Sequence, residues 1–312
     1  MMFLRQMFAA FVFFIREVSM YFPRSLLVLS AFATVQALAA DADSLAQDTL
    51  DKHFPENAEA LKVFNDDDNH PAAEDKLKSC HFAPVKEVEN ADSDGGLEGY
   101  CLRLVSEKVV DVAAGKRRYL LFAGDNLHTP HSAPGMIALF AFSSADGKDW
   151  QPAVQYQEEG FGKYGLAPTE WQWQRFGKEV WGATTFTGDA AWGGSWSSQV
   201  ILLDDGKAIH ATFVPSGFSN FSEEDGCEPE DLAQCMDVQV KSAVREDLPA
   251  VGNVYPLELS LDGFIGMAKV GKGKNAKPKP IKTFKGEKFI WLFDADKHTY
   301  VEPKGFPKMS EE

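Results

Sequence analysis

The stretch that decides the fold is WQWQRFGKEVWGATTFTGDAAWGGSWSSQVILLDDGKAIHATFV, residues 171–214. Trp171 and Trp173 alternate with glutamines, which is the two-residue period of a half-buried strand. Residues 180–187 are rich in β-branched and aromatic side chains, which suit the pleated surface of a sheet. A glycine-rich link at 188–194 then separates this run from the next one. The first half of the stretch therefore predicts two strands.

The second half of the stretch predicts a tight hairpin turn. Residues 196–203 end in the continuous apolar run Val-Ile-Leu-Leu, and residues 208–214 again have the composition of a strand. Between them lies Asp205-Gly206, a pair that readily adopts the positive φ angles of a tight hairpin. We therefore expect a hairpin here and an antiparallel meander over the whole stretch.

Strand signals recur on both sides of this meander. We expect further strands at 99–105, 108–113, 117–123, 136–142, 151–157, 237–244, 256–261, 264–270, 288–293 and 299–302. These signals predict a mainly β protein, with antiparallel meanders in a sandwich-like or irregular multi-sheet domain and a short N-terminal helical region. Asp-Gly pairs at 94–95, 146–147, 205–206 and 262–263 recur about every 55 residues, which leaves a propeller-like repeat as the alternative.

The N-terminal segment has the pattern of a secretory signal. Arg24 precedes a short apolar run at 26–35, and Ala37-Leu38-Ala39 has the small-x-small form of a cleavage site. We therefore predict a signal peptide at 1–39. Because Met20 could open such a signal, residues 1–19 are interpreted as an over-extended start.

The rest of the chain divides by composition. We expect an N-terminal helical region at 41–75, a β-rich domain at 76–305 and a tail at 306–312. Lysines crowd a segment at 271–288 that also contains glycines and prolines, which predicts a basic loop within the β-rich domain. No segment after the signal is apolar enough to cross a bilayer, so no stable membrane insertion is expected once the signal is removed.

Cysteine usage agrees with export to the periplasm or beyond the cell. An even number of cysteines in an exported chain suggests disulfides, and four cysteines allow three pairings. The local pairing Cys80–Cys101 and Cys227–Cys235 is the simplest of the three.

The formal net charge of −15 limits the choice of partner. Such a charge repels nucleic acid and anionic membranes, and it attracts a basic protein or a divalent cation. Plain solubility is the alternative explanation. We expect no nucleic-acid partner and predict a basic protein of the cell envelope.

Motifs for catalysis are absent from the sequence. It contains no H-E-x-x-H pair, no G-x-S-x-G elbow, no phosphate loop and no dinucleotide fingerprint. One loop does collect ligand-type residues, namely Asp125, His128 and His131, and a metal there would need a further ligand such as His210. The sequence therefore favours binding over catalysis.

Calcium is the one cofactor that the sequence suggests. Asp92, Asp94 and Glu98 place oxygen ligands close together, but they do not reproduce the twelve-residue calcium loop. The competing interpretation is an exposed acidic turn. No other cofactor is expected.

Tryptophans supply the remaining candidate binding residues. Trp171, Trp173, Trp192 and Trp196 could form an aromatic platform for a glycan or a protein, and the competing interpretation is a sheet core.

Taken together, these features predict an exported, acidic, β-rich binding protein of the cell envelope. One form of it is an inhibitor or immunity-type protein that masks a basic envelope enzyme. This form rests on analogy of composition. The alternatives are a carbohydrate-binding or glycan-hydrolysing protein, and a structural envelope protein without a small-molecule function.

Overall fold

The computed structural model describes most of the chain after the predicted signal. The described residues are 44–66, 76–85, 97–128, 133–191, 194–221, 232–270 and 277–309. The predicted signal peptide at 1–39 lies outside them. The chain divides into two units, Met1–Lys52 and His53–Glu312, and the described part of the first unit is helical. None of the described helices has the length and apolar character needed to span a membrane.

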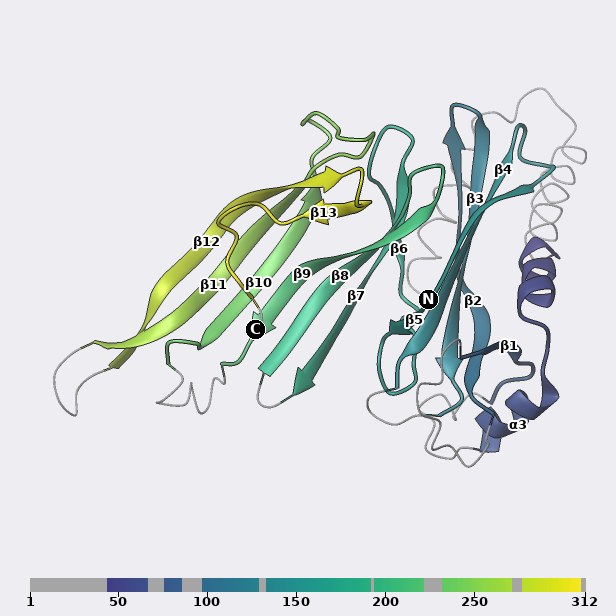
Figure 1. Cartoon of the computed structure of the whole chain (residues 1–312), viewed down its shortest axis with the longest axis horizontal. Helices are drawn as coiled ribbons and strands as arrows, with labels where there is room; N and C mark the ends of the chain where they lie inside the picture. The colour runs from purple at the N-terminus through teal and green to yellow at the C-terminus, as the bar shows by residue number, and fades with distance from the viewer. Residues whose placement is uncertain are drawn as a thin grey trace, which may run out of the picture. The chain divides into compact units, whose positions relative to one another are not determined.

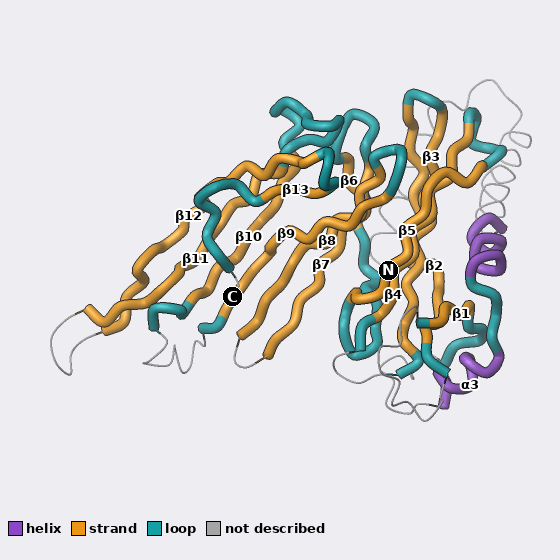
Figure 2. Tube along the Cα trace, in the orientation of Figure 1, coloured by secondary structure: helices purple, strands orange, loops and turns teal. Residues whose placement is uncertain are grey.

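The described strands of the second unit form two antiparallel sheets, and within each sheet every strand pairs with its neighbours in the sequence (Figure 1). The first sheet contains β1 (His81–Pro84), β2 (Gly99–Val112), β3 (Gly115–Asn126), β4 (Gly135–Ser144) and β5 (Gln151–Phe161). The second contains β6 (Gln172–Arg175), β7 (Trp181–Ala191), β8 (Gly194–Asp204), β9 (Ile209–Ser219), β10 (Met236–Val244), β11 (Leu257–Val270), β12 (Lys277–Asp294) and β13 (Thr299–Val301). Helix α3 (Ala58–Asp66) precedes the sheets, and a first described helix spans residues 44–53. Figure 2 shows that strands dominate the described trace.

Strand β8 explains how the two sheets share the apolar residues of the chain. Val200 and Leu202 point into the core between the sheets, together with residues of β2 to β5, β7 and β9. Ile201 and Leu203 point into a second core on the opposite face, together with residues of β10 to β13. Because both faces of β8 are buried over residues 200–203, this part of its sequence is a continuous apolar run instead of an alternating one.

The eight-stranded sheet is curled, because its terminal strand contacts a strand four positions away. The hydroxyl of Thr212 on β9 donates a hydrogen bond to the hydroxyl of Thr299 on β13, at 3.2 Å. The segment after β13 adds Phe306 to the second core, where its ring packs edge-on against Trp291. This curl brings the β8–β9 turn and the β12–β13 turn close together.

The predicted fold class is confirmed. The structure is mainly β, with antiparallel meanders in two sheets, and the helices among the described residues lie in the N-terminal part. The hairpin predicted at Asp205-Gly206 is also confirmed, because β8 and β9 pair directly across it. The described sheets contain five and eight strands, so the propeller-like alternative is wrong.

Two predicted breaks between strands are wrong. Asp262-Gly263 lies inside β11, where the register shifts at Leu261/Asp262. Gly263 has a φ of +126°, and a Cβ atom there would lie 1.9 Å from the carbonyl oxygen of Asp237. The glycine therefore serves a close approach of β10 instead of a turn. Similarly, the strands predicted at 99–105 and 108–113 form the single strand β2, which has an irregular register between Leu104 and Ser106.

The predicted basic loop is also corrected. Residues 277–288 belong to β12, which pairs with β11 over the whole of this part. The remaining residues of that prediction, 271–276, lie outside the described residues. The loop was predicted because the segment contains Pro278 and Pro280, which lack a backbone donor. Proline is nevertheless tolerated on an edge strand.

One predicted disulfide is confirmed. Cys80 and Cys101 are bonded, which joins the start of β1 to β2, and both pack with Phe64 of α3 in a small core. Cys235 is also disulfide-bonded. Its predicted partner, Cys227, lies outside the described residues.

The bridge between Cys80 and Cys101 closes a loop with a sequence separation of 21 residues. Replacing both cysteines with alanine should lower the free energy of unfolding by about 2–4 kcal/mol, because the unfolded chain regains the entropy of that loop. Urea unfolding followed by tryptophan fluorescence measures the loss. A loss below about 0.5 kcal/mol would show that the bridge contributes no such constraint.

Candidate metal centre

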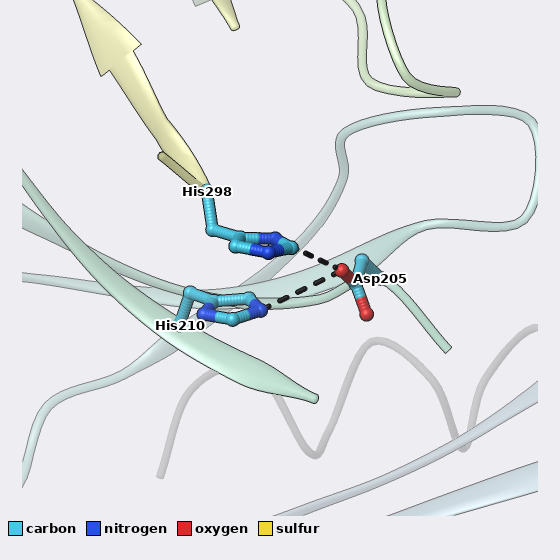
Figure 3. Close-up of side chains that lie close together, drawn as sticks. All are labelled: Asp205, His210 and His298. Carbon is cyan, nitrogen blue, oxygen red and sulfur yellow. Dashed lines mark ion pairs between the residues drawn. The ribbon is translucent and has the colours of Figure 1, made fainter. Parts of the chain in front are cut away.

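Three side chains with metal-ligand chemistry meet at one end of the eight-stranded sheet. They are Asp205, His210 and His298, and one ligand atom from each lies within 4.8 Å of the other two (Figure 3). The carboxylate oxygen Oδ2 of Asp205 is 3.5 Å from Nε2 of His210 and 3.3 Å from Nδ1 of His298. The two imidazole rings are stacked, with centroids 4.0 Å apart.

The hairpin turn fixes the carboxylate of Asp205. Gly206 has a φ of +90°, which permits the tight turn. The oxygen Oδ1 of Asp205 accepts hydrogen bonds from the backbone N–H groups of Lys207 and Ala208, at 2.8 and 2.9 Å. These bonds occupy Oδ1 and leave Oδ2 directed at the two histidines.

The two histidines come from different parts of the curled sheet. His210 lies on β9, on the same strand as Thr212, and His298 immediately precedes Thr299 of β13. The hydrogen bond between these threonines therefore holds the histidines close together. His298 has a φ of +53°, a left-handed conformation that non-glycine residues seldom adopt and that is over-represented at functional sites.

The pKa shifts of His210 and Asp205 favour the protonation states in which each side chain can bind a metal. Burial, and repulsion from His298, lower the pKa of His210, although Asp205 offsets part of this effect. Burial alone would raise the pKa of Asp205, but the N–H groups of Ala208 and Lys207 and the nearby histidines lower it. At neutral pH the cluster therefore offers a neutral imidazole and a carboxylate.

Two nitrogen atoms in the cluster lack hydrogen-bond partners. Nε2 of His210 and Nδ1 of His298 are both buried atoms, and neither forms a well-aligned hydrogen bond with any described residue; each has only an ion-pair contact with Oδ2 of Asp205. A buried polar atom without a partner costs free energy, so each one calls for an explanation. A shared cation would bind both nitrogens and Oδ2 of Asp205 at once.

In the present arrangement, the two stacked imidazole rings do not direct their nitrogens at a common ion position. An ion bound in the plane of both imidazoles requires the ring planes to meet, and here they are only 11° from parallel. Rotation about the Cβ–Cγ bond of either histidine would bring the planes together, and this torsion is broad for histidine. Metal binding would therefore change the ring orientation.

A buried ion pair supports the turn that carries Asp205. The guanidinium of Arg117 on β3 donates two hydrogen bonds to the carboxylate of Asp204, at 2.7 and 3.0 Å. The hydroxyl of Tyr119 donates a third, at 3.0 Å. Burial, and the negative charge of Asp204, raise the pKa of Tyr119, so the hydroxyl stays a donor at neutral pH. This network ties the turn to the first sheet.

The histidine loop predicted as a metal site is arranged differently. Asp125 is fully buried; its oxygen Oδ1 accepts a hydrogen bond from the N–H of Ala167, and its other oxygen pairs with Arg103. His128 is exposed and its Nε2 lies 3.2 Å from the carbonyl oxygen of Leu97. His131 lies outside the described residues. The group around His210 therefore draws on neither Asp125 nor His128.

The tryptophans predicted as a platform occupy different environments. Trp171 and Trp173 pack against the core between the sheets. Their indole N–H groups donate hydrogen bonds to the carbonyl of Pro168 and the hydroxyl of Ser106. Trp196 on β8 is 46% exposed, and Trp192 lies outside the described residues. Two of the four rings thus belong to the core, as the competing interpretation expects.

Of the three predicted calcium ligands, Glu98 alone lies among the described residues. Asp92 and Asp94 lie outside the described residues, whereas Glu98 immediately precedes β2. The calcium site at this loop stays a prediction.

Sequence reasoning named His210 as a further ligand but did not name Asp205 or His298. The signal for Asp205 was present, because the hairpin turn that holds it was predicted. His298 follows Asp205 by 93 positions, and no motif spacing connects the two residues. Only the curl of the sheet unites them.

Comparisons with known proteins add no relative: no protein-family model, no curated protein and no solved structure matches this chain.

Proposed function

We propose that this chain is an exported binding protein that holds one zinc-class divalent ion through Asp205, His210 and His298. The observation that carries the proposal is the pair of buried imidazole nitrogens that lack a well-aligned hydrogen bond and both face Oδ2 of Asp205. Two imidazoles and a carboxylate are common ligands of Zn²⁺. A bound ion would supply the partner that these buried nitrogens lack.

The donor set favours the zinc class over calcium. Ca²⁺ takes six to eight oxygen ligands, whereas this cluster offers two nitrogens and one oxygen. Imidazole suits Zn²⁺, Cu²⁺ and Ni²⁺, and affinity among these ions follows ligand type and geometry. Three protein ligands leave a fourth tetrahedral position for water or a ligand.

A bound ion would join two turns that are distant in the sequence. Asp205 belongs to the β8–β9 turn, and His298 belongs to the turn between β12 and β13. Because the three ligands converge only in the folded sheet, the ion binds the folded state in preference to the unfolded state. Its binding free energy therefore adds to the stability of the protein.

Zinc should stabilise the untagged mature protein. At a free zinc concentration of about 100 times the dissociation constant, the gain in unfolding free energy should be about 2.7 kcal/mol. The variants His210→Asn and His298→Asn should lose this gain, since each removes one of three ligands. Asparagine also tolerates the left-handed conformation at position 298. Thermal or urea unfolding with zinc and with a chelator measures the effect.

The matched control is His128→Asn, which removes an exposed histidine outside the cluster and should keep the whole gain. Equal stabilisation of the wild type and of both cluster variants would contradict the proposal. So would equilibrium dialysis in which the wild type retains no zinc.

Export is part of the proposal. The signal pattern at 1–39 and the disulfide between Cys80 and Cys101 support a periplasmic or secreted protein. The basic envelope partner, inferred from the net charge, stays a prediction that a pull-down from an envelope extract tests. The glycan alternative now depends on Trp196 and Trp192, and loss of glycan binding in Trp196→Ala would favour it.

A further inference from the structure

Strands β11 and β12 extend beyond the rest of the sheet. The last register partners of β10 and β11 are Met236 and Ile265, whereas β11 and β12 stay paired as far as Val270 and Lys277. The two strands thus form a ribbon that continues past β10, at the left of Figure 1. The distal ribbon is defined here as residues 266–270 and 277–282.

The distal ribbon is basic in an acidic protein. From Gly266 to Gly286 the sequence holds seven lysines and neither aspartate nor glutamate. Four of them lie in the described ribbon, and all four are exposed: Lys269, Lys277, Lys279 and Lys282. Only Lys282 forms an ion pair within the described residues, with Glu287 at 3.7 Å. Three cations are therefore available to an external partner.

Apolar side chains share one face with two of these lysines. Cross-strand partners point to the same face of a ribbon, and Val270 pairs with Lys277. Lys279 and Ile281 follow on the same face of β12, at intervals of two residues. Val270 is 51% exposed and Ile281 is 63% exposed. This face combines cations with uncovered apolar surface.

We propose that the distal ribbon binds an anionic bilayer surface. The lysines would contact lipid phosphates, while Val270 and Ile281 would enter the boundary between headgroups and acyl chains. A soluble polyanion could pair with the lysines but would gain nothing from the two apolar side chains. The combination of both on one face favours the bilayer.

The acidic remainder of the protein does not prevent this contact. Along β11, Val270 is eight residues from Asp262, the nearest acid on that strand, which corresponds to about 26 Å of extended chain. The Debye length at physiological salt is about 8 Å, so charges at that distance are largely screened. The tip of the distal ribbon, at Val270 and Lys277, therefore presents its own positive charge to a surface.

A protective role is the competing explanation. Among the described strands, β13 is the other neighbour of β12, and it covers Leu292 to Asp294 alone, so the distal part of β12 has a free edge. Lysines and prolines on an edge strand discourage pairing with another chain, and Pro278 and Pro280 fit that role. Such a ribbon would resist aggregation without binding lipid.

Vesicle binding by the full mature protein separates these explanations. We expect the protein to sediment with phosphatidylglycerol vesicles, and not with phosphatidylcholine vesicles, and to be released by high salt. The variant Lys277→Gln/Lys279→Gln should bind about thirty-fold more weakly. The variant Val270→Ser/Ile281→Ser, which keeps every charge, should bind at least about tenfold more weakly.

The matched control is Lys178→Gln/Lys304→Gln, which removes two exposed lysines outside the ribbon and should bind within about threefold of the wild type. The variant His298→Asn should bind vesicles normally, so failure of the metal proposal is distinguishable from failure of this one. Absence of binding to phosphatidylglycerol vesicles would leave edge protection alone and overturn the proposal. Binding to heparin as strong as to vesicles, with no effect of Val270→Ser/Ile281→Ser, would also overturn it.

Discussion

Replacing Arg117 with alanine should lower the free energy of unfolding by about 3–5 kcal/mol. The carboxylate of Asp204 is 3% exposed, and the guanidinium of Arg117 supplies two of its hydrogen bonds. The alanine variant would leave this carboxylate buried without its counter-charge. Urea unfolding at neutral pH, with and without the substitution, measures the loss.

Two further variants test this explanation. The exposed pair of Arg175 and Glu246 is the matched control, and Arg175→Ala should cost no more than about 1 kcal/mol because solvent screens that pair. The double variant Arg117→Ala/Asp204→Ala should cost less than the sum of the two single variants, since it leaves no lone charge. Additive losses would show that the ion pair is not a coupled unit.

Leu202→Ala should lower the free energy of unfolding by about 2–5 kcal/mol. Leu202 is fully buried on β8, where it packs between the two sheets. Its removal would leave a cavity in the core between the two sheets. The same unfolding assay applies.

Leu292→Ala is the matched control for the core variant, because Leu292 is 51% exposed on β12. It should cost less than about 1 kcal/mol. If both leucine variants lost the same free energy, the packing between the sheets would not be the source of stability that we describe.

Local patterns were sufficient to predict most strands. The alternation at Trp171 and Trp173, the apolar run at 200–203 and the Asp205-Gly206 turn each correspond to a structural element in the expected place. The local pairing of Cys80 with Cys101 was also within reach, because a short loop favours it. These features depend on neighbours in the sequence, which is why the sequence predicts them.

Other features depend on contacts between distant residues. Asp262-Gly263 has turn chemistry, yet the close approach of Asp237 uses the glycine inside a strand. The basic segment at 277–288 has loop composition, yet pairing with β11 holds it extended. Composition could not distinguish these cases, since the deciding partner is another strand.

The candidate site was predictable only in part. The hairpin that orients Asp205 follows from four consecutive residues, but His298 reaches it through the curl of an eight-stranded sheet. His128 and His131 lie close together in the sequence, so their spacing suggests a site. The convergence of distant residues in the fold leaves no such spacing in the sequence.

Anomalous diffraction at the zinc absorption edge, from crystals of the untagged protein grown with zinc, tests the central claim most directly. We expect one strong peak within bonding distance of Oδ2 of Asp205, Nε2 of His210 and Nδ1 of His298, at about 2.0–2.2 Å from each. We also expect the two imidazole planes to be tilted toward the ion instead of stacked. Crystals with zinc bound elsewhere, and with the two rings still stacked beside Asp205, would contradict the account.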